Sequence, residues 1–186
     1  LLAVCSSRFG EAVSPGMYND GANELKAINE KKKGLKLCAA CYHGSLTQVK
    51  RFVQKKAPID FVDDQNGFSP VHYAAQQGHQ EILSYLQLCG ARTDCVGRNG
   101  MTILLLAVVA KVSLDFVKFL MGPPFYSDVD AQTEKELISP IYLAACDGNL
   151  ELVEYLSDAE EAILDVKNMQ GWTPLHGAGK KAIPRG

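Results

Sequence analysis

The sequence predicts an all-helical solenoid, built from units that each hold a turn and two antiparallel helices. The main observation is a four-residue motif, a hydroxyl residue followed by Pro or Ile, that recurs at 69–72, 102–105, 139–142 and 173–176. The hydroxyl residues Ser69, Thr102, Ser139 and Thr173 are 33, 37 and 34 positions apart. A period in this range is typical of a stacked array, in which no unit can bury its apolar face alone.

The second unit shows the expected elements most clearly. Asp64-Gln65-Asn66-Gly67 is a turn signal, with Gly where a positive φ is expected. Ser69-Pro70 then starts a helix, because Ser is a good N-cap and Pro at the first helical position loses no hydrogen bond. Gly78 ends this first helix. Residues 81–86 predict a second, amphipathic helix.

The same positions recur in the other units. Gly44 and Gly148 match Gly78, and four apolar residues occupy one position of the second helices: Phe52, Leu86, Leu120 and Leu156. Because the apolar spacing repeats, we expect neighbouring units to share their buried surface.

This pattern resembles the ankyrin repeat, whose signature is a hairpin, Thr-Pro-Leu-His, two helices and Gly-Ala. Residues 67–75 and 171–176 match it most specifically, and the resemblance covers roughly residues 34–178. It implies an ankyrin-repeat domain over residues 34–186. The expected units are about 34–63, 64–96, 97–133, 134–167 and a truncated 168–186.

Some units depart from the pattern. The first lacks the Thr-Pro start and follows Lys31-Lys32-Lys33, so it resembles an N-terminal capping repeat with a polar outer side. The third has Ile103, Leu105 and Lys111 in place of Pro, His and Gly. The link from Gly122 to Glu136 holds Pro123-Pro124 and is longer than standard, so we expect this finger to protrude or bend.

Residues 1–33 do not fit the repeat and are expected to form an N-terminal extension. Within it, residues 24–33 predict a short helix whose apolar pair is Leu25 and Ile28. The sequence begins with Leu and ends inside a repeat, so we interpret it as a fragment of a longer protein.

Composition limits the function classes. Of the 186 residues, 47% are apolar and 22% are charged, which is typical of a globular chain. The net charge of −2 provides no extended field of one sign, so no nucleic-acid partner is expected. The longest apolar run, 103–110, is too short to span a bilayer, so no membrane insertion is expected. We expect a monomer.

The six cysteines and the absence of an Asn-x-Ser/Thr sequon favour a reducing compartment, the cytosol or nucleus. Cys38-x-x-Cys41 with His43 is the one constellation that suggests metal or redox chemistry. It lies on a predicted helix, however, at the positions of His72 and Ala75. The favoured interpretation is therefore two small core residues.

Motifs for catalysis are absent. The sequence holds no Gly-x-Ser-x-Gly elbow, phosphate-binding loop or dinucleotide fingerprint, so no catalytic residue, cofactor or metal site is expected. The resemblance implies that His72 and His176 hydrogen-bond neighbouring turns. Basic clusters at Lys31–Lys33 with Lys36, and at Lys50-Arg51 with Lys55-Lys56, predict a solvated helix face; docking of an acidic segment or nucleic acid is the alternative.

The resemblance implies a non-catalytic module that binds a partner protein through the finger tips and the concave side of the first helices. The alternative is a regulatory or substrate-targeting segment of a larger enzyme or channel. Phe68, Met101, Ile138 and Trp172 occupy matching positions and are expected to line one edge, or to pack partly onto the next finger. The full set of expected partner-binding residues is Tyr42, His43, Gln65, Asn66, Phe68, Gln76, Gln77, Arg98, Asn99, Met101, Lys135, Ile138, Asp147 and Trp172.

Overall fold

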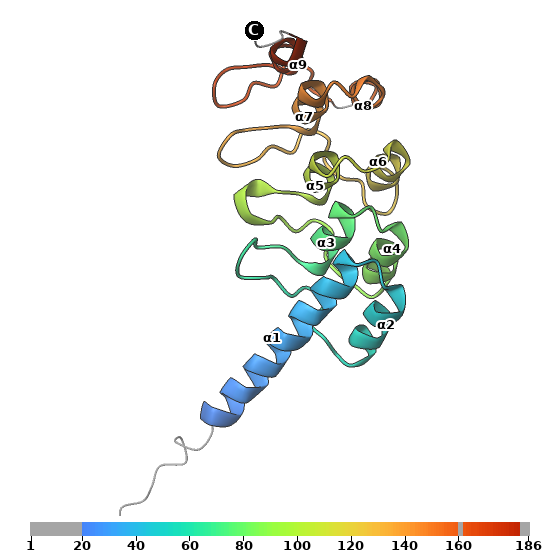
Figure 1. Cartoon of the computed structure of the whole chain (residues 1–186), viewed down its shortest axis with the longest axis vertical. Coiled ribbons are helices and arrows are strands. Elements are labelled where there is room, and N and C mark those ends of the chain that lie inside the picture. Colours follow the sequence, from blue (N-terminus) through green and yellow to red (C-terminus); the bar gives the residue numbers. More distant parts are fainter. Residues whose placement is uncertain (1–19, 160–161, 183–186) are drawn as a thin grey trace, which may run out of the picture.

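The helices stand in two neighbouring columns, and the connections between successive units project to one side as fingers (Figure 1). The computed structural model describes residues 20–159 and 162–182. The inner column holds α1 (Asp20–Tyr42), α3 (Pro70–Gln76), α5 (Ile103–Val109), α7 (Pro140–Asp147) and α9 (Pro174–Ala182). The outer column holds α2 (Leu46–Gln54), α4 (Gln80–Leu88), α6 (Leu114–Met121) and α8 (Leu150–Ser157). A short 3-10 turn, η1 (Arg98–Gly100), lies in one finger.

The regular elements of this part of the chain are helices alone, which confirms the predicted all-helical solenoid. None of these helices combines the length and apolar composition needed to cross a membrane. Inner helices contact one another in chain order, α1 with α3, α3 with α5, α5 with α7 and α7 with α9. Each unit therefore packs on the one before it.

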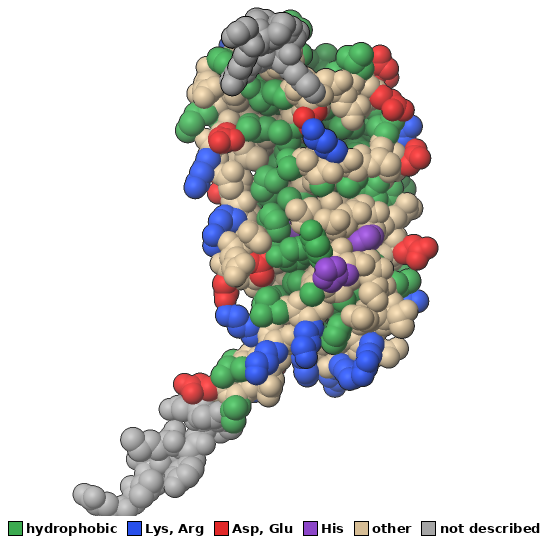
Figure 2. Space-filling view, in the orientation of Figure 1, with side chains coloured by type: hydrophobic (Ala, Val, Ile, Leu, Met, Phe, Trp, Pro, Cys, Tyr) green, Lys and Arg blue, Asp and Glu red, His purple; other side chains and the backbone are tan. Residues whose placement is uncertain are grey.

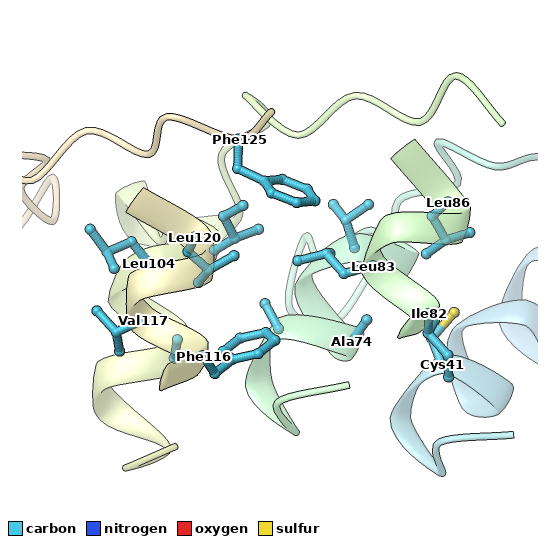
Figure 3. Packing of buried hydrophobic residues seen from close by; sticks show 14 of the residues in the cluster. Cys41, Ala74, Ile82, Leu83, Leu86, Leu104, Phe116, Val117, Leu120 and Phe125 are labelled. Atoms are coloured by element: carbon cyan, nitrogen blue, oxygen red, sulfur yellow. The ribbon is translucent and has the colours of Figure 1, made fainter. Parts of the chain in front are cut away.

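One continuous core runs between the columns. Leu86, Leu120 and Leu156 are buried, as expected from their matching positions, and Phe52 packs against the same cluster. Figure 3 shows Leu83 and Leu86 of α4 directed towards the same core as Leu120 and Phe116 of α6. Burial of each such side chain contributes roughly 1.5–3 kcal/mol. Packing within and between the units thus contributes substantially to stability.

The repeated hydroxyl residues start the inner helices as predicted. Thr102 Oγ1 accepts a hydrogen bond from the Leu105 N–H at 3.2 Å, and Ser139 Oγ accepts one from the Tyr142 N–H at 3.3 Å. At α3, His72 Nδ1 accepts the backbone N–H of Ser69 at 3.2 Å. These bonds satisfy donors that the first turn of a helix leaves without partners.

The N-terminal helix differs from the prediction. A short helix was expected over residues 24–33, followed by a separate repeat, but α1 runs without a break from Asp20 to Tyr42. Gly34, the first residue of the expected repeat domain, is buried inside the helix, and a Cβ built on it would lie 2.2 Å from the Phe61 ring. The glycine therefore provides room for Phe61, and α1 is at once the extension and the inner helix of the first repeat.

The long link after α6 folds back onto the core. Phe125 and Val129 are buried, and the Ser127 N–H donates to the Leu120 carbonyl at 3.1 Å. In Figure 3 the Phe125 ring points from the link towards the leucines below it. This anchor sets the position of the next finger.

Candidate functional site

The fingers consist of residues 63–68, 97–101, 133–138 and 168–172, and backbone hydrogen bonds join each tip to the next. The Arg98 N–H donates to the Asn66 carbonyl at 3.1 Å, and the Glu134 N–H donates to the Asn99 carbonyl at 3.0 Å. The Met169 N–H donates to the Glu136 carbonyl at 3.0 Å. The tips are therefore fixed in a row by contacts that need no particular side chain.

Asp63 organises the first of these fingers. Its carboxylate accepts the backbone N–H groups of Gln65, Asn66 and Phe68 at 2.7, 2.6 and 3.2 Å. The Tyr73 hydroxyl donates to it at 2.7 Å. Burial opposes ionisation of this carboxyl, but the hydrogen bonds outweigh burial and lower the pKa of Asp63. The charge thus holds the finger in shape.

Other fingers use different residues for the same task. Thr133 Oγ1 accepts the Ile138 N–H at 3.0 Å, and Asn168 Oδ1 accepts the Trp172 N–H at 2.9 Å. Asp63, Thr133 and Asn168 belong to no motif that the sequence shows. Each is a short polar residue four or five positions before the large residue of its finger, and that spacing was the available signal.

The large finger residues Phe68, Met101, Ile138 and Trp172 are each half-buried. Phe68 stacks on the His72 ring, with centroids 5.4 Å apart and planes 9° apart. A Cβ on Gly97 would lie 2.6 Å from the Phe68 ring, so this ring packs on the following finger. Phe68 therefore packs partly onto the next finger, which was the alternative expectation for it, and part of its side chain stays exposed.

Aromatic rings connect the first two units. Tyr73 lies edge-on to Phe68 at 5.8 Å and to Tyr42 at 6.3 Å, and Tyr42 lies edge-on to His43 at 5.4 Å. Tyr42 and His43 are exposed. Tyr42 at the end of α1, His43 directly after it, Phe68 of the finger and Tyr73 of α3 thus form one aromatic cluster on the inner column, of the kind that supplies interface anchors.

The remaining expected residues differ in exposure. Gln65, Asn66, Gln77, Arg98 and Lys135 are exposed, whereas Gln76, Asn99 and Asp147 are half-buried. Arg98 donates from its guanidinium to the Asp64 carbonyl at 3.0 Å, and Lys111 Nζ lies 2.8 Å from Asp147 Oδ1. Asn99 Oδ1 accepts the Lys135 N–H at 3.1 Å, so Asn99 supports the next finger.

One cavity lies between fingers and another lies between helices of the last units. A cavity of about 210 Å³ between the last two fingers is lined by Ile138, Tyr142 and Met169 among others. A larger, apolar cavity of about 540 Å³ lies beside α8 and α9. Leu175, which lines it, is 82% exposed, whereas the matching Val71, Leu104 and Ile141 are 1%, 0% and 4% exposed. The larger cavity is therefore lined by the surface with which a unit stacks on its neighbour. In the other units the matching residues on this surface are buried.

Cys38 and Cys41 are buried on α1. Burial raises the pKa of Cys38 to about 12, and burial also raises the pKa of Cys41. Because the thiolate is the metal ligand and the nucleophile, these side chains fit the core interpretation. No group of three or more His, Cys, Asp or Glu side chains suited to a metal occurs among residues 20–159 and 162–182. Cys5 lies outside the described residues.

Comparison with known proteins agrees with this geometry. The family described as "Ankyrin repeats (3 copies)" matches residues 37–133 and 109–182. The chain is 30% identical over 125 residues to "Nuclear factor NF-kappa-B p105 subunit" of Gallus gallus, covering 66% of this chain and 12% of that protein. It is 30% identical over 142 residues to "SH3 and multiple ankyrin repeat domains protein 1" of Mus musculus, covering 73% of this chain and 6% of that protein.

A third relative is "Probable 26S proteasome regulatory subunit p28" of Saccharomyces cerevisiae, which is 30% identical over 119 residues, or 63% of this chain and 50% of that protein. The chain thus spans at most half the length of these relatives. The family match covers most of the chain and coincides with the stacked units seen in the structure. The chain therefore belongs to the ankyrin repeat family.

Proposed function

We propose that this chain is a non-catalytic recognition module that binds a partner protein through its inner face. The inner face consists of the finger tips, Tyr42 and His43 at the end of α1, and the exposed side of α3, α5 and α7. Ankyrin repeats are in general protein–protein interaction modules, and no catalytic relative is indicated. The partner would be a folded domain or an extended segment that contacts several fingers at once.

The observation that supports this proposal best is the row of backbone hydrogen bonds between finger tips. Because Asn66, Asn99 and Glu136 each accept a bond from the next finger, the tips lose little conformational freedom when a partner docks. Preformed surfaces bind more tightly for this reason. The aromatic cluster of Tyr42, Tyr73 and Phe68 would supply the apolar centre of the contact.

Chemistry on the surface also suits a protein partner. Hydrophobic side chains run between the fingers and the outer helices on the face drawn in Figure 2, with charged side chains mostly around its edge. An apolar centre with a polar rim is typical of protein interfaces. Gln65, Arg98 and Lys135, at matching positions of successive tips, would form part of that rim.

Affinity capture with this chain, followed by titration of the captured protein, tests the proposal. Phe68→Ala and Met101→Ala are each expected to weaken binding by more than about 1 kcal/mol, with helical content unchanged by circular dichroism. Because Phe68 also packs on Gly97, a third variant, Gln65→Ala with Lys135→Ala, removes side chains that are exposed. Leu88→Ala on the outer column is the matched control. Affinity that is unchanged in all three inner-face variants would refute the proposal.

A further inference from the structure

Helix α1 carries an exposed row of mainly apolar side chains on the side opposite its buried face. Its buried side consists of Gly34, Leu37, Cys38, Ala40 and Cys41. At about 100° per residue, a second set of positions lies roughly half a turn away. We name this set the α1 seam; it consists of Leu25, Ile28, Lys32, Leu35, Ala39 and Tyr42, and all six are exposed.

The spacing within the α1 seam alternates between three and four residues throughout. This is the spacing of the a and d positions with which one helix packs along another. Leu25, Ile28, Leu35 and Tyr42 are 64%, 48%, 45% and 42% exposed. A row of this kind, about 26 Å long at 1.5 Å per residue, matches the length of a partner helix of two to three heptads.

The first half of α1 leaves the body of the repeats (Figure 1). Lys31 forms an ion pair with Asp64, and Lys33 Nζ donates to the Lys55 carbonyl at 3.4 Å, both close to the point of departure. A helix of about a dozen residues is marginal in water without packing on one face. Contact with a second helix would supply that packing.

The positive charge on and around the α1 seam favours an acidic partner. The seam and its flanks carry Lys26, Lys31, Lys32, Lys33 and Lys36 against Glu24 and Glu30. The neighbouring α2 and the turn after it add exposed Lys50, Arg51, Lys55 and Lys56, and Lys and Arg side chains gather where α1 meets the body (Figure 2). A parallel second copy would place Lys32 against Lys32 at an a position, which opposes self-pairing.

We propose that the α1 seam binds an acidic amphipathic α-helix of a partner protein, packed along α1 as in a two-stranded coiled coil. Apolar side chains of that helix contact Leu25, Ile28, Leu35 and Tyr42, and its flanking carboxylates face the lysines. This surface shares Tyr42 with the inner face, whereas Leu25, Ile28 and Leu35 belong to the seam alone, so variants at these three residues test the seam by itself.

A synthetic peptide of about three heptads, with Leu at a and d and Glu at e, g and the position facing Lys32, is the probe. Binding is measured by fluorescence anisotropy. Leu25→Gln with Ile28→Gln and Leu35→Gln is expected to weaken binding at least tenfold. Leu88→Gln with Leu150→Gln, at residues 81% and 74% exposed on the outer column, is the matched control and is expected to bind as wild type. Circular dichroism verifies the helical content of each variant.

Charge reversal gives an independent measurement. The triple variant Lys26→Glu, Lys32→Glu and Lys36→Glu is expected to bind the acidic peptide at least tenfold more weakly than wild type. It is expected to bind a matched peptide with Lys at e and g more tightly than wild type does. The Phe68→Ala, Met101→Ala double variant of the inner face is expected to bind the acidic peptide as wild type, which separates this proposal from the proposed function.

Three results would overturn the inference. The first is equal binding of the acidic peptide to wild type and the seam variant. The second is a doubled mass in sedimentation that the seam variant abolishes, since a second copy would then occupy the seam. The third is seam-dependent binding to phosphatidylserine vesicles without binding to the peptide, which would assign the seam to a membrane surface.

Discussion

The imidazole of His72 joins two repeats, because its Nε2–H donates to the carbonyl of Met101 at 3.2 Å while its Nδ1 accepts the Ser69 N–H at 3.2 Å. Both ring nitrogens are therefore used in the neutral form. His176 makes the corresponding bond within its own unit, with the Thr173 N–H at 3.3 Å, but it is exposed. His72 thus makes the hydrogen bond to a neighbouring turn that the resemblance implied for these histidines.

This arrangement predicts a pH dependence of stability. Burial lowers the pKa of His72 below its ordinary value of 6.5, against the opposing effects of the bond to Met101 and the charge of Asp63. The folded state then binds fewer protons than the unfolded state below about pH 6.5. The contribution of neutral His72 to the free energy of unfolding should therefore be complete above that pH. It should decrease as the pH falls towards the folded-state pKa of His72.

Urea unfolding at a series of pH values between 7.5 and 5 measures this effect. His72→Gln is expected to be less stable at pH 7.5 and to show a shallower fall towards pH 5. His176→Gln is the matched control and should follow the wild-type profile. An equally steep fall in the His72 variant would show that other groups cause the pH dependence.

Asp63→Ala is expected to destabilise the chain by about 1–3 kcal/mol, because three backbone N–H groups and the Tyr73 hydroxyl lose their acceptor. The sign of the pH effect follows from the lowered pKa of Asp63. Its stabilisation is present above the unfolded value near 3.9 and is lost as pH falls through the folded-state pKa.

Denaturant titration at pH 7 and pH 3 separates the two states of this carboxyl. The difference in unfolding free energy between wild type and Asp63→Ala should shrink at pH 3. Exposed Asp64, replaced by Ala, provides the neighbouring control and should change stability by well under 1 kcal/mol, since surface ion pairs contribute little. A difference at Asp63 that is the same at both pH values would contradict the role of its charge.

Much of the fold could be predicted because the repeat signature encodes local geometry. Ser69, Thr102 and Ser139 start helices, and Gly44, Gly78 and Gly148 adopt positive φ, as their residue types predict. The continuity of α1 was missed because the repeat pattern begins only near residue 34, so the helix before it was assigned to a separate extension. Gly34 is needed within the helix because of Phe61, a ring that comes close only in the folded chain.

The candidate site was less predictable. The residues at the finger tips could be named from the period, but the bonds between tips join backbone atoms and leave no trace in side-chain identity. Asp63, Thr133 and Asn168 share a task without sharing a residue type, so no motif marked them. The α1 seam was visible only as Leu25 and Ile28, because the expected helix ended before Leu35.

Lys56→Gly is expected to stabilise the chain by about 0.5–1 kcal/mol. Lys56 follows the C-terminus of α2 with a φ of 55°, at the position where the next unit has Gly90 with a φ of 89°. A left-handed conformation costs an L-residue about 1–2 kcal/mol, and glycine avoids this cost. Part of the gain is offset because glycine loses more conformational entropy on folding. Lys56 is exposed, so little packing is lost.

The midpoint of urea unfolding measures this gain. Lys56→Ala keeps the Cβ and is expected to give none, so it is the matched control. Lys111→Gly relieves a similar φ of 56° but breaks the ion pair with Asp147, and should gain less. A loss of stability in Lys56→Gly would mean that the lysine side chain makes a contribution larger than its exposure implies.

Gly34→Ala is expected to destabilise the chain, although Ala is favoured over Gly within a helix by about 1 kcal/mol. The new Cβ would lie 2.2 Å from the Phe61 ring, so the ring or α1 must move, at a typical cost of 1–3 kcal/mol for overpacking. Thermal and urea unfolding measure the net effect. In a Phe61→Ala background the clash is absent, and the same substitution should become neutral or stabilising. Destabilisation of equal size in both backgrounds would show that Phe61 is not the reason for the glycine.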